Sequence, residues 1–305
     1  MRALLCSGQG LITRGMFDRL AANDESAPVL DAAAKLLGQD PRDVLAGTSE
    51  GALIADRTSQ ILCIARALAA ASALRPQAPT MVAGYSVGEM AAWSIAGFWT
   101  ADQALRLTAH RAELMDVADA GTGGLGYVRG LDETILERLL ERHACAIAIR
   151  NPGGLYIIGG LRPDVAACCA DAVESGAVAA RPIAVGVASH TPRLAAAVAP
   201  FEQALWDEPV CAGDGAKLLI GAACATTIRA ADRAAISGLA HQLASTVDWN
   251  ALLTALAERG ARRVLELGPG DALANMVHAN WPGIDVRALD DFTTVAGARQ
   301  WFDAA

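Results

Sequence analysis

The chain has 305 residues, of which 53% are hydrophobic and 19% charged, and its formal net charge at pH 7 is −8. This length and composition are typical of a folded globule of one or two domains and exclude a disordered or fibrous chain. The scattered lysines and arginines form no basic stripe, and neither a signal segment nor an apolar run of about 18 residues occurs, so we expect a cytoplasmic protein that binds neither nucleic acid nor membrane.

The first part of the chain alternates short apolar runs with helical periodicity. The elements it predicts are a strand at 2–6, helices at 29–37 and 58–74, a strand at 80–84, and helices at 90–96 and 101–117. Each strand runs into a glycine-containing loop, and a helix follows the second loop at once. This order is typical of a protein built on a parallel sheet.

The predicted strands and helices follow one another at shorter intervals after the glycine-dense segment 119–124. The elements predicted beyond it are strands at 125–129, 145–150, 155–159 and 178–183 and helices at 132–142 and 162–175. Their β-α-β-β-α-β order fits a ferredoxin-like module. We place this module at residues 122–186.

Longer strand and helix alternation then returns. The predicted elements are a helix at 192–206, a strand near 217–220, helices near 231–243 and 249–259, a strand at 263–267, a helix at 272–279, a strand near 284–288 and a closing helix from about 294. We therefore predict the α/β class, with an α/β-hydrolase-like parallel-sheet main domain (1–121 and 187–305) interrupted by a ferredoxin-like α+β subdomain (122–186).

The segment Gly84-Tyr85-Ser86-Val87-Gly88 matches the pattern G-x-S-x-G between a predicted strand and a predicted helix. In that setting the serine occupies a tight turn, the glycines let strand and helix approach closely, and the serine Oγ is exposed as a nucleophile. The N–H of the next residue, Val87, then points to where an oxyanion would form. The same pattern also occurs by chance, as an ordinary turn with a capping serine.

A serine nucleophile needs a base. Five histidines are available: His110, His143, His190, His241 and His278. We favour His190, because it lies just after the predicted insert, where Pro192 marks the start of a helix. A lone histidine is more often a surface group or a satisfied core residue, so this choice depends on its context.

Two other patterns carry no separate function. Gly8-Gln9-Gly10 is not a dinucleotide fingerprint, because G-x-G-x-x-G requires glycine where Thr13 stands. The cysteines form an odd set without a C-x-x-C pair, so we expect no disulfide framework and no metal site, and interpret them as small buried hydrophobes. They are Cys6, Cys63, Cys145, Cys168, Cys169, Cys211 and Cys224.

Taken together, these segments resemble the malonyl-CoA:acyl carrier protein transacylases, a family that includes the acyltransferase domains of fatty-acid and polyketide synthases. The matching segments are Gly8-Gln9-Gly10, Gln60, Gly84-x-Ser86-x-Gly88-Glu89, His110-Arg111-Ala-Glu-Leu-Met115, Ser189-His190, Gln242 ahead of Val247-Asp-Trp249, and Glu266-Leu-Gly-Pro-Gly270. The resemblance extends over the whole chain.

The resemblance implies that Ser86 attacks the malonyl thioester while His190 takes its proton, which gives a malonyl-serine ester. It implies that the N–H groups of Gln9 and Val87 form the oxyanion hole and that Gln242 offers His190 Nδ1 an uncharged acceptor. It implies no metal and no cofactor: malonyl-CoA is the substrate, and the acceptor is an acyl carrier protein with a phosphopantetheine-type thiol.

The resemblance also implies that Arg111 holds the free malonyl carboxylate in a fork of two hydrogen bonds, with Gln60 as a second substrate-binding residue. Acetyl-CoA lacks that carboxylate, so its binding would leave a desolvated arginine unpaired, a penalty of about 2–5 kcal/mol. From the pattern alone, Arg111 is also compatible with a solvated charge on a helix face.

Two residues depart from the usual family pattern. Tyr85 stands where histidine is usual, and Ser7 stands where proline is usual. Neither change removes a catalytic group. The chain looks most similar to the transacylase (epsilon) subunit of bacterial malonate decarboxylase, whose acceptor is a carrier subunit with a coenzyme-A-derived thiol. Other subunits of that enzyme are then expected partners.

Other functions remain open at this stage. Within the family, the alternative is a fatty-acid or polyketide transacylase. A lipase or thioesterase shares G-x-S-x-G but needs a late histidine, for which only His278 is available, and it leaves Arg111 and Gln242 unexplained. A catalytically idle module that only docks a carrier protein is a further alternative, against which the intact serine, histidine and arginine set argues.

Overall fold

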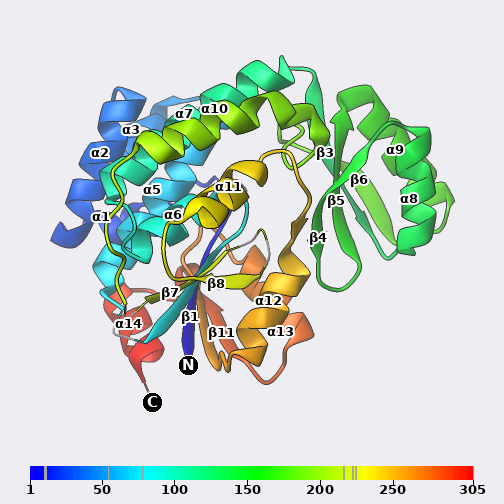
Figure 1. Ribbon diagram of the computed structural model, residues 1–305. Helices are drawn as coiled ribbons and strands as arrows, with labels where there is room; N and C mark the ends of the chain where they lie inside the picture. The colour runs from blue at the N-terminus through cyan, green and yellow to red at the C-terminus, as the bar shows by residue number, and fades with distance from the viewer. Residues whose placement is uncertain are drawn as a thin grey trace.

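The computed structural model describes residues 1–9, 12–53, 55–76, 79–215, 217–221, 223 and 225–304. Gly10 and Cys224, both named in the sequence analysis, lie outside the described residues. Two β-sheets organise the molecule, one of six strands in the order β11-β10-β1-β2-β7-β8 and one of five in the order β6-β3-β5-β4-β9 (Figure 1).

The larger sheet and its helices form the main α/β domain. Its strands are β1 (Arg2–Cys6), β2 (Thr80–Gly84), β7 (Lys217–Gly221), β8 (Thr226–Ile228), β10 (Arg263–Glu266) and β11 (Asp285–Ala288). Its helices are α1 (Asp18–Ala21), α2 (Ala27–Leu37), α3 (Pro41–Gly47), α4 (Glu50–Leu53), α5 (Asp56–Leu74), α6 (Gly88–Ile95), α7 (Ala101–Asp119), α10 (Ala195–Asp207), α11 (Arg233–His241), α12 (Trp249–Glu258), α13 (Ala272–Asn280) and α14 (Val295–Asp303). Short 3-10 turns lie at Asp24–Ser26, Pro192–Leu194 and Leu289–Asp291.

Strand β1 lies inside the larger sheet and pairs in parallel with both β2 and β10. Its side chains alternate between two cores. Leu4 and Cys6 pack into a cluster with residues of α5, α6 and α7, whereas Ala3 and Leu5 pack with residues of α12 and α13. A parallel strand covered by helices on both faces is apolar at every position, which explains the continuous apolar run in the sequence.

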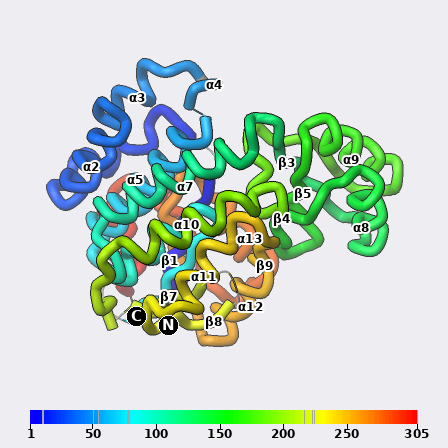
Figure 2. The backbone as a smooth tube through the Cα atoms, turned by 45° about the horizontal axis from the view of Figure 1, so that its top comes forward, coloured from blue at the N-terminus to red at the C-terminus, as the bar shows by residue number. Residues whose placement is uncertain are grey.

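The smaller sheet forms the ferredoxin-like subdomain. Its elements are β3 (Gly123–Arg129), α8 (Glu133–Arg142), β4 (Ala146–Asn151), β5 (Leu155–Leu161), α9 (Arg162–Glu174) and β6 (Ala179–Ile183). Helices α8 and α9 cover one face, as Figures 1 and 2 show, and pack on Val128, Ile147 and Ile158. The predicted β-α-β-β-α-β order is confirmed.

One connection between the two sheets has no counterpart in the sequence prediction. Strand β9 (Val247–Asp248) comes from the main-domain part of the chain and pairs in parallel with β4. The Thr246 hydroxyl next to it donates to the Ile147 carbonyl oxygen over 2.6 Å. The smaller sheet is therefore anchored to the main domain by main-chain pairing as well as by the chain crossings at its ends.

The predicted helices and strands are all present, with ends shifted by a few residues. The predicted helix 192–206 is a 3-10 turn followed by α10. The sequence prediction missed the short elements α1, α3, α4, β8 and β9, which span two to seven residues and so fall below the window in which periodicity is readable.

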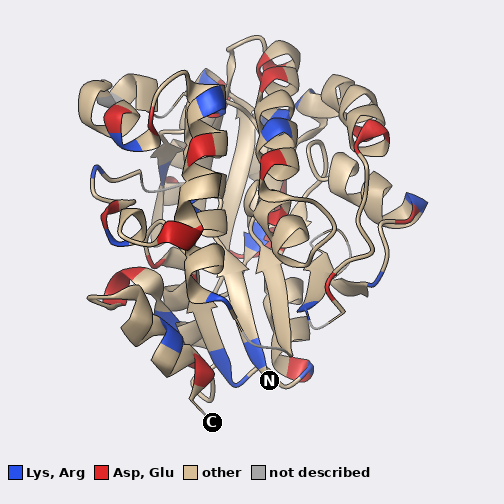
Figure 3. Cartoon of the chain, turned by 90° about the vertical axis from the view of Figure 1, so that its left-hand side faces the viewer, with Lys and Arg blue, Asp and Glu red and all other residues tan. Residues whose placement is uncertain are grey.

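The surface and the cysteines agree in part with the sequence analysis. Along the ribbon in Figure 3, Lys and Arg positions are interspersed with Asp and Glu positions. Within the described ranges, every helix is too short or too polar to cross a membrane. None of the described cysteines is in a disulfide, but Cys211 is exposed and Cys145 half-buried, so the interpretation of all cysteines as buried was wrong for these two. Cys211 lies in the extended segment after α10, where no core element covers it.

Candidate active site

Ser86 sits at the tip of a strained turn between β2 and α6, with a main-chain φ of +55°. The flanking glycines permit this turn, because a Cβ at Gly84 would lie 2.1 Å from the Glu89 nitrogen and one at Gly88 would lie 2.2 Å from the Cys6 carbonyl oxygen. No side chain fits at either position. The N-terminus of α6, with its partial positive charge, begins directly behind the serine.

His190 is the histidine that meets this serine. Ser86 Oγ lies 2.7 Å from His190 Nε2, and His190 Nδ1 lies 2.6 Å from the Gln242 carbonyl oxygen. Because a carbonyl oxygen can only accept, Nδ1 must carry the proton. The Nε2 lone pair of the neutral ring is therefore free to accept the Ser86 hydroxyl proton.

Gln242 acts on His190 through its main chain. The resemblance implied an uncharged acceptor at this residue, and the structure assigns that part to the carbonyl group of the chain. The Gln242 side chain instead donates from Nε2 to the buried Glu89 carboxylate. Since Glu89 lies three residues after Ser86, these contacts form a closed loop that joins the serine turn to the histidine.

The surroundings of His190 keep its ring neutral. The side chain is buried, with 1% of the residue exposed. Burial first, and the positive charge of Arg111 second, lower the pKa of His190 to about 3, while the hydrogen bond to Gln242 acts in the opposite direction. The ring is therefore unprotonated at neutral pH and available as a proton acceptor.

Arg111 lies on α7 with 2% of the residue exposed, so it is not a solvated helix-face charge. Its Nη1 donates to Gln60 Oε1 over 2.6 Å, and its Nη2 is buried without a partner among the described residues. Burial lowers the pKa of Arg111 to about 10, against the effects of Asp56 and Glu89. The guanidinium thus stays charged at neutral pH and keeps one donor open for a ligand.

Gln9 and Val87, the residues expected to form an oxyanion hole, flank Ser86. Gln9 follows β1 and lines the same cavity as Ser86, and Val87 is the N-cap of α6. In the described part of the chain, neither N–H donates to a main-chain carbonyl. Both groups are therefore free to bind a developing negative charge, although the oxyanion-hole role itself stays a prediction.

The serine and histidine open into a cavity of about 180 Å³ between the main domain and the subdomain. Its polar lining consists of Gln9, Tyr85, Ser86, Ser189 and His190, and its apolar lining of Leu125, Ile149, Ile157, Ile183 and Val185 from the subdomain. A larger cavity of about 470 Å³ shares Leu125, Ile183 and Val185 with it. The subdomain thus supplies an apolar wall opposite the nucleophile.

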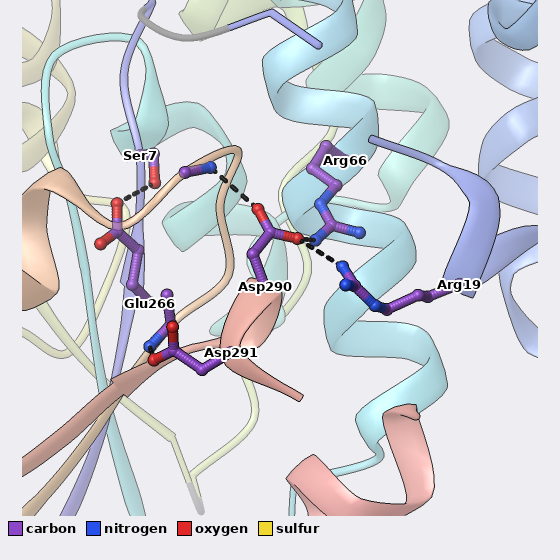
Figure 4. Close-up of polar contacts among 8 residues, drawn as sticks. Ser7, Arg19, Arg66, Glu266, Asp290 and Asp291 are labelled. Carbon is purple, nitrogen blue, oxygen red and sulfur yellow. Dashed lines mark hydrogen bonds and ion pairs between the residues drawn. The ribbon is translucent and has the colours of Figure 1, made fainter. Parts of the chain in front are cut away.

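Three residues that the sequence analysis named, Ser7, Tyr85 and Glu266, make contacts that it did not predict. Ser7, which replaces the usual proline, donates its hydroxyl to the buried Glu266 over 2.7 Å (Figure 4). The second Glu266 oxygen accepts from the Ala274 N–H. Burial raises the pKa of Glu266 to about 7. Tyr85, which replaces the usual histidine, packs edge-on against Trp249 with the ring centroids 5.1 Å apart.

The sequence analysis also missed a buried ion pair next to Gly268 and Gly270. The fully buried Arg66 pairs with Asp290 over 2.7 Å, and the same carboxylate accepts from the Gly270 N–H and from Arg19 (Figure 4). Asp56, which lies four residues before Gln60 and so on the same helix face, was also missed. Its spacing from Gln60 was the available signal.

The other histidines do not approach Ser86. His143 bonds to Asp171 over 2.8 Å, His241 bonds within its own helix, His110 lies 3.7 Å from Glu113, and His278 is exposed on α13. The hydrolase alternative, which required His278, therefore lacks its base. Among the described residues, no cluster of His, Cys, Asp or Glu has the arrangement of a metal site.

Comparison with known proteins gives a consistent family. A family model described as acyl transferase domain matches residues 3–282. The malonyl CoA-acyl carrier protein transacylase of Mycobacterium bovis is 28% identical over 295 residues, which cover 95% of this chain and 96% of that protein. The solved acyl-carrier-protein S-malonyltransferase of Burkholderia pseudomallei has a TM-score of 0.88 and 26% identity, with 98% of this chain and 99% of that one covered.

A second solved structure adds a partner. A malonyl-transacylase in complex with its type II polyketide acyl-carrier protein has a TM-score of 0.91 and 25% identity, with 98% of this chain and 99% of that chain covered. The two-sheet architecture of the chain is thus shared over its whole length with these proteins.

Proposed function

Since the chain belongs to the acyltransferase family, we propose that it transfers a malonyl group from coenzyme A to an acyl carrier protein, with Ser86 as nucleophile and His190 as its base. The observation that carries the proposal is the 2.7 Å contact between Ser86 Oγ and His190 Nε2 beside the buried charge of Arg111. The names of the relatives, malonyl transacylases of Mycobacterium and Burkholderia, agree with it.

In the proposed reaction, Ser86 Oγ attacks the thioester carbonyl as His190 Nε2 takes its proton. The N–H groups of Gln9 and Val87 would bind the oxyanion, where the loss of one donor typically costs about 3 kcal/mol of barrier. Collapse breaks the C–S bond, and the His190 proton passes to the leaving thiol. The carrier thiol then reverses these steps on the malonyl-serine, which makes the mechanism ping-pong and requires no cofactor.

Arg111 would select the malonyl group. Its open Nη2 and its place beside His190 and Gln60 fit a carboxylate at the far end of a short acyl group. The apolar subdomain wall would limit the access of water, which favours transfer to a thiol over hydrolysis. A thioesterase function gains no comparable support, because it has no use for a buried cation.

The finer proposal concerns the acceptor. We propose the carrier subunit of malonate decarboxylase, in the cytoplasm, with the other subunits of that enzyme as partners. Support comes from Ser7 and Tyr85, which depart from the pattern of fatty-acid transacylases and make specific contacts with Glu266 and Trp249. A fatty-acid or polyketide carrier is the alternative, and the relatives' names favour it.

One experiment tests both levels. The protein is incubated with malonyl-CoA and analysed by intact mass, and the acyl-enzyme is then offered the three classes of carrier protein. We expect one added malonyl mass on the wild type, none on Ser86→Ala, and fastest discharge to the malonate decarboxylase carrier. A label on Ser86→Ala would refute the nucleophile, and equal or slower discharge to that carrier would refute only the acceptor.

A further inference from the structure

A buried carboxyl group lies one side chain away from Arg111. Asp56, the first residue of α5, is 7% exposed. Gln60 bridges the two charged groups: its Nε2 donates to Asp56 Oδ2 over 2.7 Å, and its Oε1 accepts from Arg111 Nη1 over 2.6 Å. This bridge fixes the carboxyl group and the guanidinium relative to each other without a direct salt bridge.

The bridge leaves one polar atom open at each end. Asp56 Oδ1 and Arg111 Nη2 are both buried, and neither has a hydrogen-bond partner in the described ranges. A native fold rarely leaves buried polar atoms unpaired, because each costs about 1–3 kcal/mol. Both ends of the bridge are linked to residues of the catalytic cavity, because Gln9 donates to Ser59 on the first turn of the same helix and the charge of Arg111 acts on His190.

Several charged groups surround this bridge and act on the pKa of Asp56. The other charged or titratable groups that face Asp56 and Arg111 are Asp116 and Asp119 on α7, Glu89 on α6, and His190. Burial raises the pKa of Asp56, and Asp119 adds to this, while Gln60, Arg111 and Gln9 act in the opposite direction. The surroundings thus favour the protonated form of both Asp56 and Asp116, and of these two only Asp56 is joined to Arg111 through Gln60.

Binding of the substrate changes that balance. A malonyl group at Arg111 brings a further carboxylate into a buried space that already holds Asp56. When two carboxylates share such a site, the pKa of one of them is strongly raised. We propose that Asp56 takes up one proton from solvent when the malonyl carboxylate binds Arg111, which leaves the positive charge of Arg111 for the substrate. The inference rests on the proposed malonyl transfer.

Acylation itself takes up no net proton, so a proton bound by Asp56 can be measured separately. In acylation the Ser86 O–C bond forms, the C–S bond breaks, and the serine proton passes through His190 to the coenzyme A thiolate. Below the thiol pKa of about 8.5, this sequence neither consumes nor releases a proton. Acetyl-CoA follows the same sequence without bringing a carboxylate. Any proton uptake that malonyl-CoA causes and acetyl-CoA does not therefore belongs to the carboxylate site.

The first measurement is proton uptake by the whole protein. A pH indicator in weak buffer follows acyl-enzyme formation between pH 6 and 8, with the malonyl-serine counted by mass. We expect uptake that approaches one proton per malonyl-serine, and none per acetyl-serine. The isosteric Asp56→Asn keeps an oxygen for the Gln60 amide and should abolish the uptake. Malonyl-serine formed without uptake at every pH would overturn the inference.

The second measurement is the ratio of kcat/KM for malonyl-CoA to that for acetyl-CoA, in which effects of Ser86 and His190 on both substrates cancel. By linkage, the ratio should fall by up to about tenfold per pH unit in the wild type and stay flat in Asp56→Asn. Asp116→Asn is the matched control, because Asp116 is a solvent-exposed neighbour whose pKa is raised to about 6 by partial desolvation and nearby carboxylates.

The outcomes separate the two proposals. Loss of the pH slope in Asp116→Asn, with the slope kept in Asp56→Asn, would assign the proton to Asp116 and overturn the inference. Wild-type protein that forms no malonyl-serine would instead overturn the proposed function. A malonyl-serine whose formation shows no pH-dependent preference overturns the role of Asp56 alone.

Discussion

Ser86 and His190 both adopt a left-handed main-chain conformation, with φ of +55° and +60°. Such a conformation costs a non-glycine residue about 1–3 kcal/mol, so surrounding contacts must enforce it. The His190 N–H donates to the Leu243 carbonyl oxygen over 2.8 Å, and the Tyr85 N–H donates to the Cys6 carbonyl oxygen over 2.9 Å. Main-chain hydrogen bonds to neighbouring elements thus hold both strained turns in place, and the side chains of Ser86 and His190 contact each other.

The role of His190 predicts a large and selective loss of rate. His190→Ala removes the acceptor that lies 2.7 Å from Ser86 Oγ, so malonylation and transfer should both slow by about 10²–10⁴-fold. His278→Ala, which changes an exposed side chain on α13, should retain wild-type rates. Single-turnover kinetics on folded variants measures both. Greater damage from His278→Ala would support a hydrolase arrangement instead.

The buried charge of Arg111 predicts a change in substrate preference. Arg111→Ala should lower kcat/KM for malonyl-CoA by the equivalent of about 2–5 kcal/mol and leave acetyl-CoA unchanged or improved, because acetyl never pairs with the guanidinium. Arg111→Lys serves as the control for charge without a fork. An equal loss for both substrates would mean that Arg111 supports the fold or binds coenzyme A.

At the residue scale, motif and spacing selected residues that contact one another: Ser86 meets His190, and Arg111 donates to Gln60. The roles of these four residues in the reaction stay predictions. The sequence did not distinguish the main chain of Gln242 from its side chain, because a motif identifies a residue and not the atom that it presents. Asp56 was missed because a carboxylate at the start of a helix is ordinarily read as a solvated first-turn charge.

At the element scale, the crossing of α6 over β1 decides the geometry of the nucleophile. Gly88 lies so close to the Cys6 carbonyl oxygen that helix and strand touch through their main chains. That contact fixes the direction from which α6 leaves the serine turn. The long, periodic elements were predictable because their pattern repeats several times, whereas β9 pairs through only two residues and depends on a partner 98 positions away.

The contact at Gly88 predicts a strong effect of one methyl group. In Gly88→Ala the new Cβ would lie 2.2 Å from a carbonyl oxygen, so α6 must move, which should cost about 1–3 kcal/mol or more and misplace Ser86. Gly47→Ala is the control, because no atom lies within 4 Å of a Cβ there. The free energy of unfolding in urea and the acylation rate should both fall in Gly88→Ala and stay at the wild-type level in Gly47→Ala. Wild-type behaviour of Gly88→Ala would contradict the close crossing.

At the scale of the whole molecule, the catalytic cavity lies where the subdomain packs against the main domain. The larger sheet presents Ser86 and the smaller sheet presents Leu125 and Ile183 across the gap. The alternation of predicted elements was enough for the parallel-sheet main domain and the insert. The relative placement of the two sheets was not predictable, because it depends on the pairing of β4 with β9 and on contacts between distant side chains.

Glu266 links three parts of the molecule and predicts how global stability varies with pH. Its carboxyl group is fully buried between the end of β1 and the start of α13, and burial raises its pKa to about 7 from an ordinary value of 4.5. A folded-state pKa above the unfolded value means that the unfolded chain releases its proton first. Glu266 therefore destabilises the fold progressively as the pH rises from about 4.5 to about 7, and by a constant amount above that.

Glu266→Gln should remove this dependence. The amide oxygen can still accept from the Ala274 N–H, and the amide nitrogen can donate to Ser7 Oγ, whose hydroxyl can turn to accept. Relative to the wild type, the variant should gain about 3 kcal/mol of unfolding free energy between pH 5 and pH 8, as the pKa difference requires. Urea unfolding at the two pH values measures the gain, and comparison with the wild type cancels the opposite contribution of His190.

The exposed Glu137→Gln should show no such change. A pH-independent difference between Glu266→Gln and the wild type would mean that the Glu266 carboxyl group is already ionised at pH 5 and that its bonds to Ser7 and Ala274 outweigh its burial.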